Sequence, residues 1–344
     1  MSSTTATENT ISPGQRVLVT GATGYTGSTL VQKLLNQNVE VVAIARPSSD
    51  LSRWQDAPIR WIQGDVFDPK LIQEAMEGVN YIFHMVTPFR EAKSSDDVYY
   101  NVHVKSTQLL ANEALKQPDF KRFVHISTIG VHGHIENPPA DETYRTSPGD
   151  LYQSTKLEGE IWIKQFGAET GLPITIIRPA GIIGPGEKRL LKIYKMVCSG
   201  LVPAIGNGGN LLHLIHVDDL TNCFLLASQH PNAVNEIFIC GNQDSISFKE
   251  MVNLISKYYQ KKATLLQLPS APLFLLGDIL EFVCKPLNIE PPIYRRRLAF
   301  YTKDRSFNVN KLKSKLGFVP QHSNEQCITE LAQWYLEEGW TNIS

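Results

Sequence analysis

The stretch Arg16–Gly27, with the sequence RVLVTGATGYTG, decides the fold class of this chain of 344 residues. Its residues Val17–Thr20 are typical of a buried strand, and they run directly into a glycine-rich turn and an apolar helix. Gly21 permits a tight turn, Gly24 lets backbone amides approach a pyrophosphate, and Gly27 lets the helix pack closely on the strand. The N-terminus of that helix also offers free N–H groups and a partial positive charge to phosphates. The stretch therefore predicts the first βαβ unit of a dinucleotide-binding fold.

The same alternation continues through the N-terminal half of the chain. Short β-branched runs suit parallel strands that are buried on both faces, at Arg16–Thr20, Glu40–Ala45, Ile59–Gln63, Tyr81–His84, Arg122–Ser127 and Ile174–Arg178. Stretches with a helical pattern lie between them, at Thr26–Asn36, Pro69–Met76, Val98–Lys116 and Leu151–Glu169. We therefore predict an α/β fold with a doubly wound parallel sheet, a Rossmann fold, whose ligand sites lie at the carboxyl ends of the strands.

The pattern changes after Pro179, where glycine and proline become frequent and less strand material separates the helices. We expect residues 181–210 and 243–344 to form a second, smaller, mostly helical lobe that binds the substrate. Residues 14–180 and 211–242 then form the dinucleotide-binding domain. Residues 1–13 are rich in serine and threonine and lack the apolar segment of a signal peptide, so they are predicted to be a disordered tail.

The composition excludes several classes of protein. The chain has 33 Lys and Arg against 34 Asp and Glu, a net charge of -1, so it lacks the excess of basic residues that is typical of proteins that bind nucleic acid. No apolar run reaches the roughly 18 residues that a membrane-spanning helix needs. The 5 cysteines include no CxxC pair, which argues against a disulfide framework and favours reduced thiols in a cytoplasmic protein. His132 and His134 lie in a loop without a clear third ligand, so no metal site is predicted.

The end of the second strand favours NADP over NAD. An NAD site has a carboxylate there for the ribose hydroxyls, whereas this strand ends in Ala45 followed by Arg46. A guanidinium group suits a 2′-phosphate, although in the simpler interpretation Arg46 is a solvated surface residue. Asp65, after the third strand, either accepts from the adenine amino group or caps the next helix. The residues expected to bind the coenzyme are Gly21, Thr23, Gly24, Tyr25, Thr26, Gly27, Arg46, Asp65, Val66, Met85, Val86, Thr87, Lys156 and Pro179.

The catalytic candidates begin with Tyr152 and Lys156, which lie on one face of a predicted helix. A phenol with a pKa of about 10 is a poor base at neutral pH, but a nearby ammonium group favours the phenolate. The tyrosine can then protonate an alkoxide or deprotonate an alcohol, while Lys156 also holds the nicotinamide ribose. A hydroxyl group is expected at the end of the fifth strand, where either Ser127 or Thr128 would project onto the carbonyl oxygen of a substrate.

Five motifs occur in the order and spacing of a known family: Gly21–Gly27, Ser127-Thr128, Tyr152–Lys156, Arg178-Pro179 and His216–Asp219. Together they resemble the extended short-chain dehydrogenase/reductase family, and the resemblance covers nearly the whole chain past residue 14. It implies that Thr128 is the catalytic hydroxyl and that Asn101 supports the active-site helix. It also implies a homodimer that is formed through the helices Val98–Lys116 and Leu151–Glu169. His216 and the two aspartates after it are expected to cap and brace a junction between strand and helix.

Residues that are absent narrow the activity within this family. Sugar 4,6-dehydratases carry an Asp-Glu pair after the catalytic threonine, whereas Thr128 is followed by Ile129-Gly130. Nucleotide-sugar epimerases carry polar residues around the sugar diphosphate, where this chain has the apolar stretches Gly181–Gly184 and Leu211–Ile215. The chain then resembles the 3β-hydroxysteroid dehydrogenase and dihydroflavonol-reductase-like branch, whose substrates are apolar ketones or secondary alcohols. The segment Ala271–Val283 either lines an apolar pocket or is an ordinary core helix.

We therefore expect an NADP-dependent oxidoreductase that interconverts a ketone and a secondary alcohol on a small hydrophobic substrate of steroid, flavonoid or long-chain type. Two alternatives stay open: a nucleotide-sugar epimerase that retains NAD, and a catalytically silent NADP-binding scaffold. Arg295–Arg297 are either a solvated charge run or a contact for anionic lipid or a substrate carboxylate.

Overall fold

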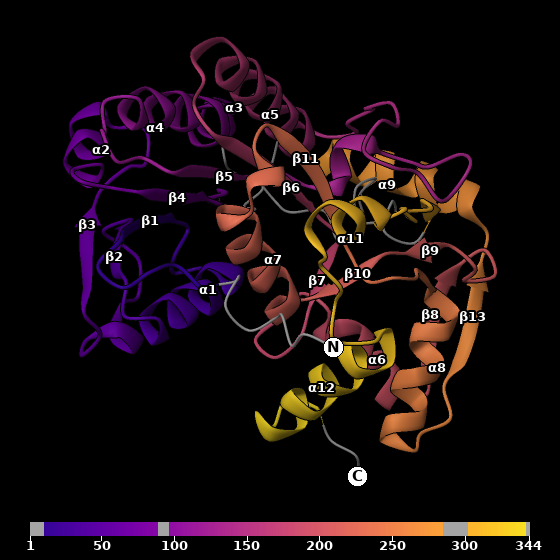
Figure 1. The fold of residues 1–344 in the computed structure, drawn as a ribbon. Coiled ribbons are helices and arrows are strands. Elements are labelled where there is room, and N and C mark those ends of the chain that lie inside the picture. The colour runs from indigo at the N-terminus through magenta and orange to yellow at the C-terminus, as the bar shows by residue number, and fades with distance from the viewer. Residues whose placement is uncertain (1–9, 89–95, 285–301, 342–344) are drawn as a thin grey trace, which may run out of the picture.

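A seven-stranded sheet forms the centre of the computed structural model, which describes residues 10–88, 96–284 and 302–341 (Figure 1). All its strands run parallel, in the order β11-β6-β5-β4-β1-β2-β3. Their bounds are Arg16–Thr20 (β1), Glu40–Ala45 (β2), Ile59–Gln63 (β3), Tyr81–His84 (β4), Arg122–Ile126 (β5), Ile174–Pro179 (β6) and Glu236–Cys240 (β11). The chain winds outward first from β1 and then from β4, so the strand order reverses between these two strands. The predicted doubly wound α/β fold is confirmed.

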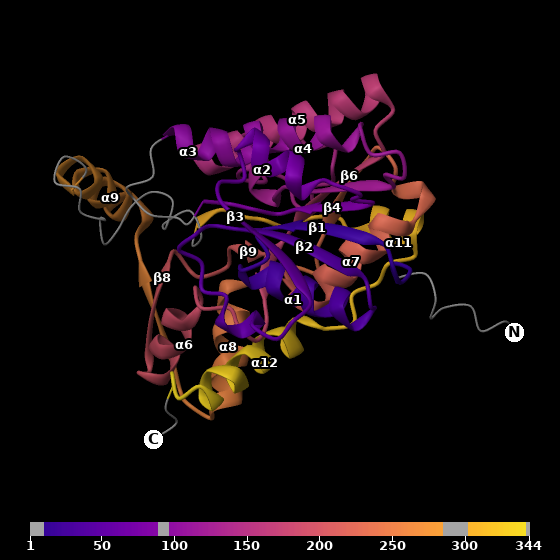
Figure 2. The ribbon, with the colours of Figure 1, turned by 90° about the vertical axis from the view of Figure 1, so that its left-hand side faces the viewer.

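Side chains of the strands alternate between two hydrophobic cores, one on each face of the sheet. In β1, Val17 and Val19 pack with α1 (Tyr25–Asn36), α7 (Val217–Gln229) and α11 (Asn310–Leu316). Leu18 packs on the other face with α2 (Pro69–Ala75), α4 (Ser106–Ala114) and α5 (Leu151–Thr170). Figure 2 shows the two helix layers on opposite sides of the sheet. Burial on both faces explains why the strands are continuous apolar runs.

The stretch Val98–Lys116, predicted as one helix, is interrupted in the structure. It consists of α3 (Asp96–Tyr100), a π-helical turn η2 (Asn101–Lys105) and α4. The side chains that follow the turn bond back to it, because Ser106 Oγ donates to the carbonyl oxygen of Val102 at 2.5 Å and Thr107 Oγ1 to that of His103 at 2.7 Å. Such turns occur mostly near functional sites, and this one faces α5.

A third hydrophobic core lies in a smaller lobe, at the lower right of Figure 1. The lobe contains α6 (Leu191–Cys198), α8 (Phe248–Tyr259), α9 (Ser270–Cys284) and α12 (Asn324–Glu337). It also contains pairs of short strands: β7 (Gly181–Ile183) with β10 (Leu214–His216), β9 (Leu211–Leu212) with β12 (Ile246–Ser247), and β8 (Leu201–Ile205) with β13 (Thr264–Leu268). Short 3-10 turns lie at Ser52–Trp54 (η1), Ile129–His132 (η3) and Pro231–Ala233 (η4). Of residues 211–242, only β11 joins the large sheet as a strand.

The predicted tail of residues 1–13 extends too far into the chain. Ile11 is buried in the core beside α1, and its backbone N–H donates to Gln37 Oε1 at 2.9 Å. Residues 10–13 therefore belong to the folded part, because a buried apolar side chain ties them to it. Residues 1–9 lie outside the described residues.

The helix α9 exposes most of its apolar side chains. Leu275 is 63% exposed and Phe282 is 81% exposed, and Figure 2 shows the helix projecting from the body of the molecule. The interpretation of Ala271–Val283 as an ordinary core helix is therefore wrong. Within the described ranges, no helix combines the length and the apolar character that crossing a membrane requires. Arg295–Arg297 lie outside the described residues.

A buried ion pair fastens α5 to the sheet. Arg178 in β6 donates from Nε to one oxygen of Glu160 at 3.1 Å and from Nη2 to the other. Its Nη1 donates to His132 Nε2 at 2.9 Å and to the carbonyl oxygen of Glu142 at 3.1 Å. Only 5% of the Arg178 side chain and 3% of the Glu160 side chain are exposed, so each charge depends on the other for solvation.

The Arg178→Met variant should lower the free energy of unfolding by about 3–5 kcal/mol, because it leaves the Glu160 carboxylate buried without a partner. Adding Glu160→Met should recover most of that loss. Urea unfolding followed by circular dichroism measures both changes. The pair Lys257–Glu325, whose side chains are 76% and 55% exposed, is the matched control, and Lys257→Met should cost less than about 1 kcal/mol. Equal losses for Arg178→Met and Lys257→Met would contradict the effect assigned to burial.

Candidate active site

The glycine-rich turn after β1 has the geometry that a pyrophosphate site requires. Gly21 has a φ of 77°, which favours glycine, and a Cβ there would lie 3.1 Å from the backbone of Val86. A Cβ on Gly27 would overlap the carbonyl oxygen of Gly21. Gly24 is the N-cap of α1 and supplies no side-chain cap, so the first N–H groups of the helix are available to a phosphate. Thr23 is exposed at this turn and Thr26 is half-buried. These residues fit the predicted coenzyme.

The side chain of Tyr25 points toward the second lobe. A Cβ on Gly184 would lie 3.2 Å from the Tyr25 hydroxyl, and one on Gly186 would lie 3.0 Å from its ring. The hydroxyl is buried and has no hydrogen-bond partner within the described ranges. Burial raises the pKa of Tyr25, and the charge of Glu187 raises it further. Only the backbone N–H of Tyr25, at the start of α1, is therefore placed for the predicted contact with a phosphate.

The residues expected at the adenosine lie at the ends of β2 and β3, which are neighbouring strands. Arg46 and Asp65 are both exposed there, whereas Val66 is buried in the core, with 7% exposed. The helix cap after β3 is Asp68, which accepts from the N–H groups of Lys70 at 2.8 Å and of Leu71 at 3.4 Å. The alternative interpretation of Asp65 as the cap is therefore wrong.

The end of β4 lies beside the glycine-rich turn. The backbone N–H of Val86 donates to Thr20 Oγ1, at the end of β1, at 3.4 Å. Met85 and Val86 are half-buried, and Thr87 is exposed. Pro179 is the last residue of β6 and is buried at the same edge of the sheet. This edge is the place where open α/β sheets bind their ligands.

Lys156 joins this edge to α5. Its side chain is buried, with 3% exposed, and Nζ donates to the carbonyl oxygens of Val86 at 3.3 Å and of Ile126 at 3.1 Å. These two residues precede Thr87 and Ser127, so the lysine lies between the ends of β4 and β5. Burial lowers the pKa of the Lys156 ammonium group to about 7.

The two candidate hydroxyls follow β5 and differ in their surroundings. Ser127 is 4% exposed, and its Oγ has no hydrogen-bond partner in the part of the chain that the structure describes. Thr128 is half-buried and caps η3, where its Oγ1 accepts from the N–H of Gly130 at 3.0 Å. The hydroxyl hydrogen of Thr128 thus remains for a second partner.

Tyr152 lies in the first turn of α5, one helical turn before Lys156. Asp150 caps the helix and accepts from the N–H of Gln153 at 2.8 Å. The ring of Tyr152 is half-buried and packs edge to face against His103, with centroids 5.4 Å apart. The structure therefore brings Tyr152 and Lys156 to the ends of β4 and β5.

His103, two residues after the predicted Asn101, makes a side-chain hydrogen bond to α5. Its Nδ1 lies 2.8 Å from Thr155 Oγ1, and its Nε2 lies 3.2 Å from Thr87 Oγ1. No side-chain hydrogen bond of Asn101 to α5 occurs among the described residues. The sequence offered no signal for the contact of His103, because the π-helical turn that carries it looks like ordinary helix in the sequence.

The loop after β7 contains Arg189, a cation that the sequence analysis missed. Its charge interacts with Tyr25 and Tyr152. Glu187 is buried, and its two carboxylate oxygens accept from Nε of Arg189 at 2.8 and 2.9 Å. Burial by itself lowers the pKa of Arg189. The hydrogen bonds and the charge of Glu187, together with Tyr152 and Tyr25, have the larger effect, so the pKa of Arg189 is raised overall. The side chain is 59% exposed, so solvent and ligands can reach it. The available signal was the Glu-x-Arg spacing after Gly184–Gly186.

The predicted role of His216 and the aspartates after it is confirmed. His216 Nδ1 accepts from the N–H of Asp218 at 3.2 Å and caps α7. Asp219 is buried, and its Oδ2 accepts from the N–H groups of Gln321 at 3.0 Å and of His322 at 2.9 Å. These contacts brace the junction between β10 and α7 against the C-terminal segment.

One group of side chains is close enough together to suggest a metal ion: His216, His322 and Glu330. The two imidazole rings are stacked, with centroids 3.9 Å apart and planes inclined by 20°. Lone pairs in stacked rings run parallel and do not converge on one ion, so this arrangement suits the junction and not a metal. His132 and His134 bind different partners, since His132 contacts Arg178 and His134 Nδ1 accepts from the N–H of Asp304 at 3.2 Å.

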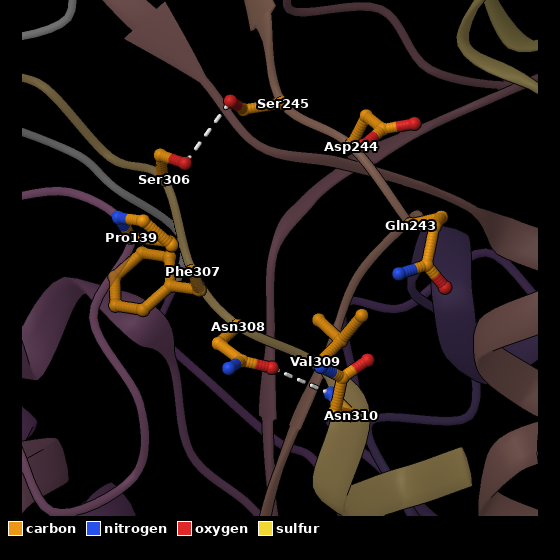
Figure 3. A pocket seen from close by; sticks show the side chains of 9 residues that line it. All are labelled: Pro139, Gln243, Asp244, Ser245, Ser306, Phe307, Asn308, Val309 and Asn310. Atoms are coloured by element: carbon orange, nitrogen blue, oxygen red, sulfur yellow. Dashed lines mark hydrogen bonds between the residues drawn. The ribbon is translucent and has the colours of Figure 1, made fainter.

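A separate polar hollow of about 300 Å³ lies between the segment after β11 and the segment before α11 (Figure 3). Ser245 and Ser306 meet across it, with their hydroxyl oxygens 3.0 Å apart. On the other side, Asn308 Oδ1 accepts from the N–H of Asn310 at 2.9 Å. None of the predicted site residues lines this hollow.

The parallel sheet, the glycine-rich turn and the Tyr152–Lys156 pair define the class of the protein, the nicotinamide-dinucleotide-dependent enzymes of the short-chain dehydrogenase/reductase type. A model of the NAD dependent epimerase/dehydratase family matches residues 17–241, and the chain belongs to that family.

Similar proteins have several activities in their names. A putative dihydroflavonol 4-reductase from Synechocystis sp. is 28% identical over 341 residues, which cover 94% of this chain and 95% of that protein. A 3-beta-hydroxysteroid dehydrogenase from Mycolicibacterium neoaurum is 26% identical over 347 residues, which cover 94% of this chain and 92% of that protein. The solved structure of a dTDP-glucose 4,6-dehydratase from Streptomyces venezuelae, with NAD bound, superposes with a TM-score of 0.75 at 22% identity and covers 96% of this chain and 100% of that one.

The lowered pKa of Lys156 should make the stability of the protein depend on pH. The unfolded chain keeps this proton up to about pH 10, whereas the folded chain releases it near pH 7. Between these values the unfolded state binds more protons, so stability rises with pH. Relative to Lys156→Met, the free energy of unfolding of the native chain should rise by up to about 1.4 kcal/mol per pH unit above pH 7.

Urea unfolding of both chains without coenzyme, at several pH values between 6 and 9, measures this difference. The exposed Lys192 supplies the control variant Lys192→Met, which should follow the native chain at every pH. A constant difference between the native chain and Lys156→Met across this range would show that Lys156 does not titrate there.

Proposed function

We propose that this protein is an NADP-dependent oxidoreductase that interconverts a ketone and a secondary alcohol on a small hydrophobic substrate. The observation that carries the proposal is the placement of the buried Lys156 between the ends of β4 and β5, with Tyr152 one helical turn away. Thr128 and Ser127 follow β5 at the same edge. The names of the relatives, a dihydroflavonol reductase and a hydroxysteroid dehydrogenase, support a ketone or secondary alcohol as the reacting group.

Each side chain of the site has a distinct part in this reaction. When bound, the coenzyme supplies a hydride to the substrate carbon or accepts one from it. Tyr152 donates a proton to the substrate oxygen in the reduction and takes one from it in the oxidation. Thr128 donates its free hydroxyl hydrogen to the same oxygen, because its Oγ1 already accepts from Gly130. A positive charge on Lys156 favours the phenolate form of a neighbouring tyrosine.

The coenzyme assignment depends on the end of β2. Arg46 is exposed directly after this strand, where a 2′-phosphate needs a cation. Glu40, at the opposite end of the strand, accepts from Nε of Arg16 at 2.9 Å, so it does not compete for the ribose. Asp65 is exposed at the end of the neighbouring strand and is proposed to accept from the adenine amino group.

A second candidate is a nucleotide-sugar epimerase that retains NAD, and two observations favour it. The apolar side chains of Leu212, Leu214 and Ile215 are buried, so the stretch expected to repel a diphosphate lies in the core instead of facing a ligand. The guanidinium group of Arg189 is accessible and available to an anionic substrate. Coenzyme that leaves the protein during turnover, with net oxidation or reduction, would rule this candidate out.

We further propose a homodimer that forms through α4 and α5. The outer surface of this helix pair exposes apolar side chains, with Ile161 56% exposed, Leu115 45% and Leu151 37%. Trp162 stacks on Phe166 along the same helix, with ring centroids 4.6 Å apart. Apolar side chains on adjoining helices favour association with a second copy. A location in the cytoplasm stays a prediction from the sequence.

Tyr152→Phe should abolish turnover in a screen of carbonyl substrates with NADPH and NADH, because it removes the proton donor. Coenzyme binding, followed by NADPH fluorescence, should change by less than about threefold. The same four-residue spacing recurs at Tyr258 and Lys262, and Tyr258 packs in the third core. Tyr258→Phe is therefore the matched control and should keep native turnover.

Turnover retained in Tyr152→Phe would remove this residue from the mechanism. A native chain that binds NADPH but turns over no carbonyl substrate would favour the catalytically silent scaffold.

Arg46→Asp should weaken NADP binding by about 100-fold or more while NAD binding changes little, because the carboxylate repels a 2′-phosphate and suits a free ribose. Titration of both coenzymes against the native and variant chains measures the ratio. Arg60→Asp is the control, since Arg60 is an exposed arginine of β3 that pairs with Glu74 at 3.3 Å. Equal losses for the two coenzymes, or no loss for either, would refute the assignment of Arg46.

A further inference from the structure

His103 lies at the centre of a buried contact between η2 and α5. Only 1% of the residue is exposed. A Cβ on Gly159 of α5 would lie 2.6 Å from the carbonyl oxygen of His103, so the glycine is what lets the two elements approach this closely. The imidazole ring then reaches the first turn of α5 and packs edge to face on Tyr152, with an interplanar angle of 76°.

We assign the hydrogen of the His103 ring from the hydrogen bonds of Thr155. Thr155 Oγ1 has one hydrogen and donates it to the carbonyl oxygen of Leu151 at 2.8 Å. It therefore accepts from Nδ1 of His103, 2.8 Å away. In the neutral ring Nε2 is then an acceptor, and the hydroxyl of Thr87, 3.2 Å away, donates to it.

These hydrogen bonds orient the hydroxyl hydrogen of Thr87. Its hydrogen points inward to His103, which leaves the lone pairs of Oγ1 for a donor on its exposed side. Thr87 is exposed, and it follows Val86, whose carbonyl oxygen accepts from Lys156. A sugar hydroxyl is a donor of the right kind at this place.

We propose that His103 is a positioning residue that makes Thr87 a hydrogen-bond acceptor for a ribose hydroxyl of the bound coenzyme and holds the ring of Tyr152 beside it. The inference rests on the proposed function, because it takes a dinucleotide to be the ligand at the end of β4. It adds a role for a histidine that neither touches the coenzyme nor exchanges the substrate proton.

The experiment is a double-variant cycle on coenzyme binding, measured with the full chain by NADPH fluorescence. Thr87→Val removes the acceptor, and His103→Phe keeps a ring against Tyr152 but loses both hydrogen bonds. Each single variant should weaken binding by about three- to tenfold, the effect of one hydrogen bond. The double variant should bind no more weakly than either single variant, because both remove the same contact. Losses that multiply in the double variant would overturn the proposal.

Controls separate this effect from a loss of structure. Thr87→Ser should restore native binding, since it restores the hydroxyl. Thr107→Val removes a neighbouring buried hydroxyl that donates to the backbone carbonyl oxygen of His103 at 2.7 Å, and it should change binding by less than about twofold. If His103→Phe does not fold, Thr155→Val replaces it, because it removes the acceptor that orients the imidazole ring. Thr155→Val should weaken binding in the native chain and not in Thr87→Val, and equal losses in both would overturn the proposal.

These readouts also keep the two proposals apart. A native chain that binds neither NADPH nor NADH would defeat the proposed function itself. A native chain that binds NADPH and loses affinity independently at Thr87 and His103 would defeat only the inference about His103.

Discussion

The buried ammonium group of Lys156 is the contact on which the geometry of the site depends. It donates to two backbone carbonyl oxygens, those of Val86 and Ile126, that lie at or just beyond the ends of neighbouring strands. Within a sheet each carbonyl bonds to the next strand, so such oxygens become available to a side chain only where the strands end. A lysine that must meet both oxygens can occupy only one place along the edge. The helix that carries it is thereby held in one register, with Tyr152 one turn before it.

Other polar side chains of α5 also fix the position of this helix. The residues that this helix buries are mostly polar, and they include Gln153, Thr155, Lys156 and Glu160. Thr155 meets His103, and Glu160 meets Arg178 of β6, so directional bonds hold the helix at several points along its length. An apolar stripe would allow the helix to slide or rotate by small amounts, whereas a hydrogen bond requires a defined distance and angle between its partners. The helix α5 is therefore positioned by buried polar groups, each of which would be costly without its partner.

Much of the fold could be predicted because it follows from local patterns. The strands of the central sheet that were expected from β-branched runs appear with bounds that agree within one residue, and the glycine-rich turn has the close contacts that its three glycines imply. The expectations that failed concern contacts between segments that are distant in the chain. The π-helical turn at Asn101–Lys105 packs on Gly159 of α5, which is distant in the chain, and there His103 hydrogen-bonds Thr155 of that helix. The stretch Leu211–Ile215 was expected to face a ligand because of its place before His216 in the family pattern, but most of it is buried.

The amino-acid sequence alone was sufficient for the class of fold, the order of the strands of its first half and the glycine-rich turn, because periodicity and turn preferences act over a few residues. Only the tertiary structure decided which atoms meet: the carbonyl oxygens that hold Lys156, the contact of His103 with Thr155, and the buried pair of Arg178 and Glu160. The reason is that a hydrogen bond requires its two partners at a defined distance and angle, and that burial depends on which elements cover a side chain. Both are set by elements that come together from distant parts of the chain, after each local preference has already been satisfied.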